Sequence, residues 1–302
     1  MADGSKIEWT DATWNPVTGC TVVSPGCTNC YAMRLAGTRM KNHPSRAGLT
    51  TASRAGPVWN GQVRLNEEWL GQPLRWTRPR MVFVCAHGDL FHEAVSDEWL
   101  DRVFAVMALC PQHTFQVLTK RAERMCKYSS GILNGLDSGL AAAFANHRPM
   151  PGQDWRWPLK NVWFGVSIEN QDHVKRWWSL YYTSAATRFV SFEPLLGPVR
   201  MDCLHCHGKG FYNDHQGTFC RTCDGTGETL DRLDWAIVGG ESGPRARPMH
   251  PDWAHSLHDR CADAGVPFFF KQWGEFDSLG VRTGKKVAGR TLGGVEHNGF
   301  PV

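Results

Sequence analysis

Short apolar runs, separated by amphipathic stretches, restrict this chain to a small set of folds. The runs barely alternate between apolar and polar residues, so each is expected to form a strand covered on both faces, as parallel strands are. They span residues 81–85, 115–119, 162–167, 188–192, 235–238 and 267–270, after an early strand near Thr13 to Val17. Helical spacing of apolar residues lies between them over 97–107, where Ser96 is the expected N-cap, and over 171–181 and 252–264. This alternation predicts the α/β class and one domain over residues 1–302, a complete or partial (β/α) barrel.

Polar side chains follow the predicted strands. In (β/α) barrels the chemistry lies at the carboxyl ends of the strands. Any one of these residues could be an ordinary solvated loop residue, but a polar group after every apolar run favours a common site. The residues are His87, Asp89, His92, Glu93, Lys120, Ser167, Glu169, Asn170, Glu193, Glu241 and Lys271. Residues 42–61, rich in Gly, Pro, Ser and Arg, predict a surface loop or lid.

Three cysteines, Cys20, Cys27 and Cys30, share one short loop near the N-terminus. Three thiolates are one too few for a closed tetrahedral zinc site unless another residue joins them. An incomplete zinc knot, or a disulfide beside a free thiol, stays open as an alternative. Three are enough to hold a four-iron cluster with one iron free for a small molecule. Tyr31 and Ala32 follow at the expected start of a helix, where thiolates are stabilised.

A second cysteine group interrupts the strand–helix pattern at residues 203–229. Two Cys-x-x-Cys pairs each run into a Gly-x-Gly sequence, and together they supply the four thiolates of a structural zinc site. The ligands are Cys203, Cys206, Cys220 and Cys223. The repeat resembles one unit of the DnaJ-type chaperone zinc domain, over this insertion alone. We expect a Zn²⁺ ion to stabilise this insertion, which has no apolar core of its own. The more specific alternative is that the insertion also binds a substrate.

Composition narrows the cellular setting. The chain has 302 residues, a net charge of +4 and eleven cysteines. No apolar run is long enough to span a membrane, and no apolar signal core follows Met1. We therefore expect a cytoplasmic protein with no membrane partner, whose cysteines bind metal rather than form disulfides. The charge permits contact with nucleic acid without arguing for it.

Several of these pieces resemble the radical S-adenosylmethionine (SAM) superfamily, nearest its spore photoproduct lyase-like branch. They are the Cys20, Cys27 and Cys30 loop with Tyr31-Ala32, the turn over 87–93, Leu118-Thr119-Lys120, Ser167 and Glu193-Pro194. Three further segments are similar to an uncharacterised family common in bacteriophages and some bacteria, which would place the protein in a host cytoplasm. These segments span residues 9–16, 238–243 and 270–274.

The resemblance implies an enzyme with a [4Fe-4S] cluster on Cys20, Cys27 and Cys30. The open iron would bind SAM, an electron donor would drive its cleavage, and the resulting radical would take hydrogen from a substrate. That substrate is unknown, with a nucleobase, nucleotide or nucleic acid as the candidate. The resemblance places Tyr31 near the adenine and Lys120 near the SAM carboxylate or a substrate anion. It makes Asp89, Ser167, Glu169 and Glu193 candidates for the ribose and amino group.

Two other interpretations stay open. The first is a non-catalytic, zinc-containing nucleic-acid-binding phage protein, which the basic loops and the fourteen tryptophans suit. The second is a hydrolase-like barrel in which the cysteine loop binds zinc with His87 or His92. The colour of the purified protein separates them, because a four-iron cluster is brown and zinc is colourless.

Overall fold

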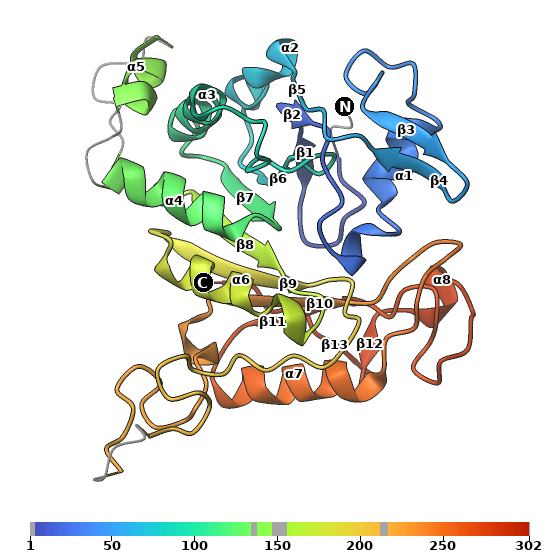
Figure 1. The fold of residues 1–302 in the computed structure, drawn as a ribbon, viewed down its shortest axis with the longest axis vertical. Coiled ribbons are helices and arrows are strands. Elements are labelled where there is room, and N and C mark those ends of the chain that lie inside the picture. The colour runs from blue at the N-terminus through green and yellow to red at the C-terminus, as the bar shows by residue number, and fades with distance from the viewer. Residues whose placement is uncertain (1–3, 134–137, 147–155, 212–216, 302) are drawn as a thin grey trace. The chain divides into compact units, whose positions relative to one another are not determined.

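The computed structural model describes residues 4–133, 138–146, 156–211 and 217–301. The chain divides into two compact units. The N-unit comprises Met1–Val166 with Tyr182–Thr187, and the C-unit comprises Ser167–Tyr181 with Arg188–Val302. Figure 1 shows the elements of each unit.

The N-unit is built on parallel strands in the order of the sequence, β1-β6-β7-β8 (Figure 1). These strands are β1 (Ala12–Trp14), β6 (Met81–Val84), β7 (Thr114–Thr119) and β8 (Val162–Ser167), the last ending at the first residue of the C-unit. Its helices are α1 (Tyr31–Gly37), α2 (Glu67–Leu70), α3 (Asp97–Ala108), α4 (Ala122–Leu133) and α5 (Ser138–Asn146). Two small antiparallel pairs complete it, β2 (Val17–Thr18) with β5 (Arg64–Leu65) and β3 (Thr50–Ser53) with β4 (Gly56–Trp59).

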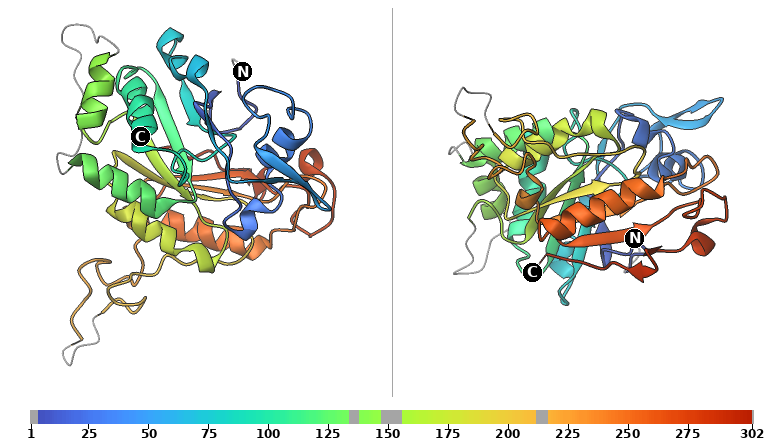
Figure 2. Two further views of the ribbon diagram at one scale, coloured as in Figure 1. Left: turned by 45° about the horizontal axis from the view of Figure 1, so that its top comes forward. Right: turned by 90° about the horizontal axis from the view of Figure 1, so that it is seen from below.

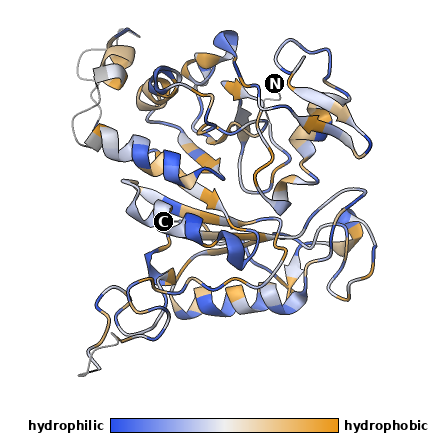
Figure 3. Ribbon diagram, viewed as in Figure 1, coloured by the Kyte–Doolittle hydropathy of each residue, from blue (hydrophilic) through white to orange (hydrophobic). Residues whose placement is uncertain are grey.

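The C-unit contains the parallel strands β9 (Thr187–Phe192), β10 (Trp235–Gly239) and β11 (Phe268–Gln272). Every residue of β10 is buried, as a strand covered on both faces requires. Helix α7 (Pro251–Asp263) packs along β10 and β11 (Figure 2), and its polar and apolar residues alternate along its length (Figure 3). The unit also holds α6 (Lys175–Tyr182), α8 (Lys285–Ala288) and the hairpin β12 (Thr291–Leu292) with β13 (Val295–Glu296).

The α/β class and the expected strands are confirmed, and closure of a barrel and the single domain over 1–302 stay predictions. Ser96 caps α3 as expected, because its Oγ accepts from the Trp99 N–H at 3.3 Å. The prediction of a loop over 42–61 was wrong in part, since β3 and β4 form a hairpin there. The early strand divides into β1 and β2, and β11 runs on through Lys271. No helix of the described residues is long and apolar enough to cross a membrane.

Candidate functional site

The N-terminal cysteine loop is fixed against the end of β6. Gly19 opens it with a φ of +96°, and a Cβ there would lie 2.2 Å from the Gln62 carbonyl oxygen, so only glycine fits. The Gly19 N–H donates to the His87 carbonyl at 3.2 Å. Cys27 ends a short 3₁₀ turn, and Cys30 is the N-cap of α1, as the sequence predicts.

The three thiols of this loop are neighbours. Cys20 and Cys30 both pack against one apolar cluster, which contains Ala32, Met33, Ala36, Leu49 and Trp59. Burial, followed by the charge of Asp89, raises the pKa of Cys20 to about 12, and burial raises the pKa of Cys30. Cys27 ends the 3₁₀ turn three residues before Cys30, and its carbonyl accepts from the Cys30 N–H at 3.2 Å. Because burial disfavours the charged form, these cysteines would ionise only beside a positive charge, and a bound metal centre would supply such a charge.

Asp89 lies beside this loop and accepts four hydrogen bonds. Its Oδ1 accepts from the Thr119 hydroxyl at 2.6 Å and the Phe91 N–H at 3.0 Å. Its Oδ2 accepts from the Lys120 N–H at 3.2 Å and from Arg121 Nη1 at 3.0 Å. Two of these donors lie at the end of β7 or directly after it, so the carboxylate links the end of β7 to the turn that follows β6.

Arg121 joins that carboxylate to the cysteine loop. Its Nη1 also donates to Cys20 Sγ at 3.3 Å, and its Nε contacts both oxygens of Glu93 at 3.1 and 3.2 Å. The cation lowers the pKa of Cys20 against the larger effects of burial and Asp89. Sequence reasoning missed Arg121, although it directly follows Lys120 at the end of β7. His92 closes the same turn, with Nε2 at 2.6 Å from the Thr21 hydroxyl.

The strand ends of the C-unit form ion pairs of their own. Glu169 is fully buried, and its Oε2 accepts from Arg176 Nη1 at 2.7 Å, while the Ser167 carbonyl accepts from the same nitrogen. Glu193 pairs with Lys271 Nζ at 2.7 Å. A third pair joins Glu241 to Arg247 at 2.7 and 2.9 Å. The predicted residues Ser167, Glu169 and Glu193 therefore lie at these ends, two of them already bound to a cation of the chain.

The insertion brings its four cysteines together as the sequence predicts. They are the one group of three or more ligand side chains in the described part of the chain whose donor atoms all lie within 4.8 Å of one another. Cys203 Sγ lies 3.7 Å from Cys220 Sγ, and Cys206 Sγ lies 3.6 Å from Cys223 Sγ. A tetrahedral ion with bonds of about 2.3 Å to sulfur spaces its thiolates by about 3.8 Å. The four sulfurs therefore fit a single ion.

The two halves of the insertion repeat one backbone pattern. The Gly210 and Gly227 N–H groups donate to Cys206 Sγ and Cys223 Sγ, both at 3.3 Å. Each of these glycines has a φ near +80°, and an added Cβ would lie 2.1 Å from the Gly225 carbonyl oxygen or 2.3 Å from that of Gly208. Glycine thus allows the halves to approach and aims backbone dipoles at the sulfurs.

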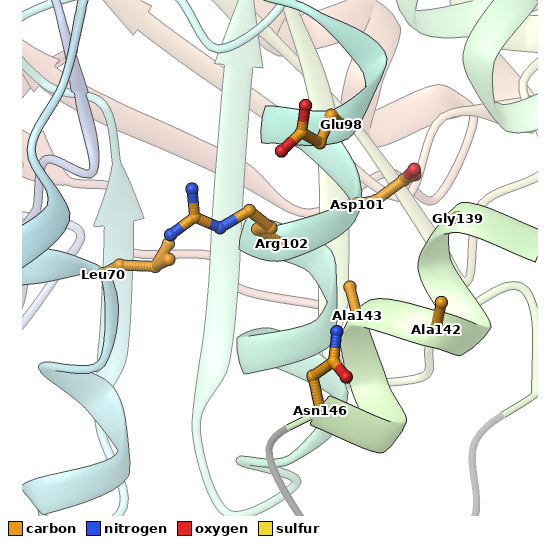
Figure 4. A pocket seen from close by; sticks show the side chains of 8 residues that line it. All are labelled: Leu70, Glu98, Asp101, Arg102, Gly139, Ala142, Ala143 and Asn146. Carbon is orange, nitrogen blue, oxygen red and sulfur yellow. The ribbon is translucent and has the colours of Figure 1, made fainter.

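A pocket between α3 and α5 lies outside these groups (Figure 4). Its charged residues are Glu98, Asp101 and Arg102, and Arg102 is already paired with Glu67. Gly139 faces Asp101 so closely that a Cβ would lie 2.0 Å from its Oδ2. None of the predicted site residues lines this pocket.

Comparison with known proteins places the whole chain in a single family. A family model described as "Protein of unknown function (DUF5131)" matches residues 4–301. No curated protein and no solved structure matches the chain.

Proposed function

The chain belongs to the DUF5131 family, and we propose that it is a radical-SAM-type enzyme with an iron–sulfur cluster on Cys20, Cys27 and Cys30. The partial barrel suggested by its parallel strands is the fold we propose for it. A nucleobase or nucleotide is the candidate substrate, and an electron donor is the implied partner.

One observation carries this proposal, the contrast between the two cysteine groups. The insertion cysteines meet at the spacing of a single ion, whereas the loop cysteines share one small region without forming such a group. A polynuclear cluster separates its thiolates more widely than one ion does and uses three of them when one iron stays open. The loop therefore suits a cluster, and the insertion suits structural zinc.

The residues around the loop would position and protect that cluster. Arg121, held by Asp89, donates to Cys20 Sγ, and such hydrogen bonds tune a cluster's potential. Tyr31 is half exposed, and its hydroxyl donates to the Ala86 carbonyl at 2.6 Å, so its ring is held in place beside Cys30. SAM bound to a cluster of this kind supplies a radical that abstracts hydrogen.

For two carboxylates we propose roles that differ from those the resemblance implies. Both oxygens of Asp89 are already occupied by protein donors. Glu169 is buried against Arg176. We propose that both hold the site's framework rather than contact SAM. Glu193 and Lys271 lie closer to solvent, and we propose that this pair meets a ligand's polar groups.

Metal analysis of variants tests the proposal. Anaerobically reconstituted protein should contain about four irons and one zinc per chain. Cys27→Ala should lose the iron and keep the zinc, whereas Cys206→Ser should lose the zinc and keep the iron. Cys126→Ala, a matched change in α4, should retain both. The reduced wild type with SAM should release 5′-deoxyadenosine. Full iron content in Cys27→Ala, or no deoxyadenosine from the loaded protein, would overturn the proposal.

A further inference from the structure

Arg46 is a buried cation that pairs with no carboxylate among the described residues. The residue lies between α1 and β3, and only 3% of it is exposed. Its Nη1 donates to the Ser45 hydroxyl at 2.6 Å and carbonyl at 3.3 Å, and its guanidinium lies over the Trp69 ring at 5.7 Å. Its Nε is buried without a hydrogen-bond acceptor among the described residues. Two neutral acceptors on one residue do not replace the water that this charge has lost.

The other buried arginines of the described chain are satisfied differently. Arg121 is paired with Asp89 and Glu93, and Arg176 is paired with Glu169. An unpaired buried charge costs several kcal/mol in general. The residues of the structure do not offset this cost at Arg46, which indicates that an anion from outside the chain does so.

The groups that face Arg46 fit such an anion. The Thr18 hydroxyl donates to the Ser45 carbonyl at 2.6 Å, and the N–H of the next residue, Gly19, donates to the His87 carbonyl at 3.2 Å, so the segments that carry Arg46 and His87 lie side by side. The groups whose charges act on Arg46 are Cys85, Tyr31 and Arg64, and none of these is a carboxylate. The Nδ1 atom of His87 is buried and has no partner among the described residues. The Tyr31 and His87 rings meet edge to face at 5.8 Å. A guanidinium and an imidazole, each with a buried nitrogen to spare, are typical of oxyanion binding.

This group adjoins the cysteine loop. The Ser45 carbonyl accepts from the Thr18 hydroxyl at 2.6 Å, two residues before Cys20. Cys85, at the end of β6, is within electrostatic range of both Arg46 and Cys20. Tyr31 directly follows Cys30. A ligand held at Arg46 would therefore lie next to the proposed cluster.

We propose that Arg46 and His87 form a subsite for an oxyanion, a phosphate or a carboxylate, on a ligand of the cysteine loop. This subsite would define the class of ligand that the proposed enzyme binds. The identity of the ligand that carries the anion rests on the proposed function, whereas the binding of an anion does not. Binding of the anion itself needs no iron, so it is measurable on protein with and without the cluster.

Thermal unfolding of three variants tests the subsite. The probes are inorganic phosphate and S-adenosylhomocysteine, which carries an amino-acid carboxylate. At about 100 times its Kd, the bound probe should raise the Tm of the wild type by about 5 °C. Arg46→Gln should abolish this rise without lowering the Tm of the ligand-free protein, because it removes an unpaired buried charge. Arg46→Lys should keep part of it, and Arg39→Gln, an exposed control, should keep all of it.

The two probes identify the source of the anion. A rise with phosphate supports a phosphorylated substrate, and a rise with S-adenosylhomocysteine alone supports a carboxylate. The subsite is refuted if neither probe changes the Tm of the wild type, or if Arg46→Gln keeps the full rise. If the reconstituted wild type takes up no iron while the rise stays intact, the cluster is refuted and the subsite stands.

Discussion

Replacing Asp89 with Asn should strongly destabilise the N-unit while barely changing its shape. An Asn side chain has one oxygen and one NH₂ group. If the NH₂ takes the place of Oδ2, it faces the Lys120 N–H and Arg121, and in the other orientation it faces the Thr119 hydroxyl and the Phe91 N–H. The first orientation sets two buried donors against a third. The second sets the NH₂ group against the Phe91 N–H, while the Thr119 hydroxyl can turn to accept from it, and leaves Arg121 with a neutral acceptor.

The magnitude follows from what Arg121 loses. Its other acidic partner, Glu93, has a side chain that is 66% exposed and so gives little compensation. Removing one partner of a buried ion pair costs about 3–5 kcal/mol of unfolding free energy. With a urea m-value of about 2 kcal/mol/M, the midpoint should fall by about 2 M. The control Glu93→Gln should cost less than about 1 kcal/mol.

Urea unfolding followed by tryptophan fluorescence measures this change. The double variant Asp89→Asn with Arg121→Met should recover part of the loss, because the buried guanidinium is removed while the Asn oxygen still accepts from the Thr119 hydroxyl and the Phe91 N–H. A second readout is the Cys20 thiol, whose pKa should fall without the Asp89 charge, so iodoacetamide should modify it faster. An Asp89→Asn midpoint within 0.5 M of the wild type, roughly a quarter of the expected shift, would refute the reasoning.

Three more results are expected. Burial, then the charge of Arg46, lowers the pKa of His87 from 6.5 to about 4, so the unfolded chain binds this proton first as pH falls. The unfolding free energy should therefore drop by up to about 1.4 kcal/mol per pH unit from pH 6.5 towards 4, and His87→Asn should flatten the curve measured by urea titration. Zinc chelation should raise amide hydrogen exchange in residues 203–211 and 217–229 and leave α7 protected, since the insertion has no apolar core; exchange that rises equally in α7 would contradict this. Gly227→Ala should weaken zinc retention against a chelator, because its Cβ would clash with the Gly208 carbonyl; Gly217→Ala, which shares the positive φ but meets no atom within 4 Å, should weaken it less.

Local patterns were enough to predict most elements and the ligands of the insertion. Continuous apolar runs predict strands such as β6 and β10, because a strand that is covered on both faces needs apolar side chains on both faces. Ser96 marks the start of α3 because its hydroxyl accepts from a backbone N–H within the first turn. The Cys-x-x-Cys pairs predict the four-cysteine group because their glycines and thiols lie within each short repeat.

The tertiary structure alone decided the partners of the charged residues. Arg46 lies in a segment without periodicity, and nothing nearby in the sequence shows that it would be buried without a carboxylate. Arg121 reaches Cys20 across 101 positions of sequence. Its place at a strand end predicts Glu169 as a ligand residue, and only the fold shows that it is buried and accepts from Arg176. A charge acts on whatever lies within a few ångströms in a medium of low polarity, and chain folding, rather than sequence spacing, sets those distances.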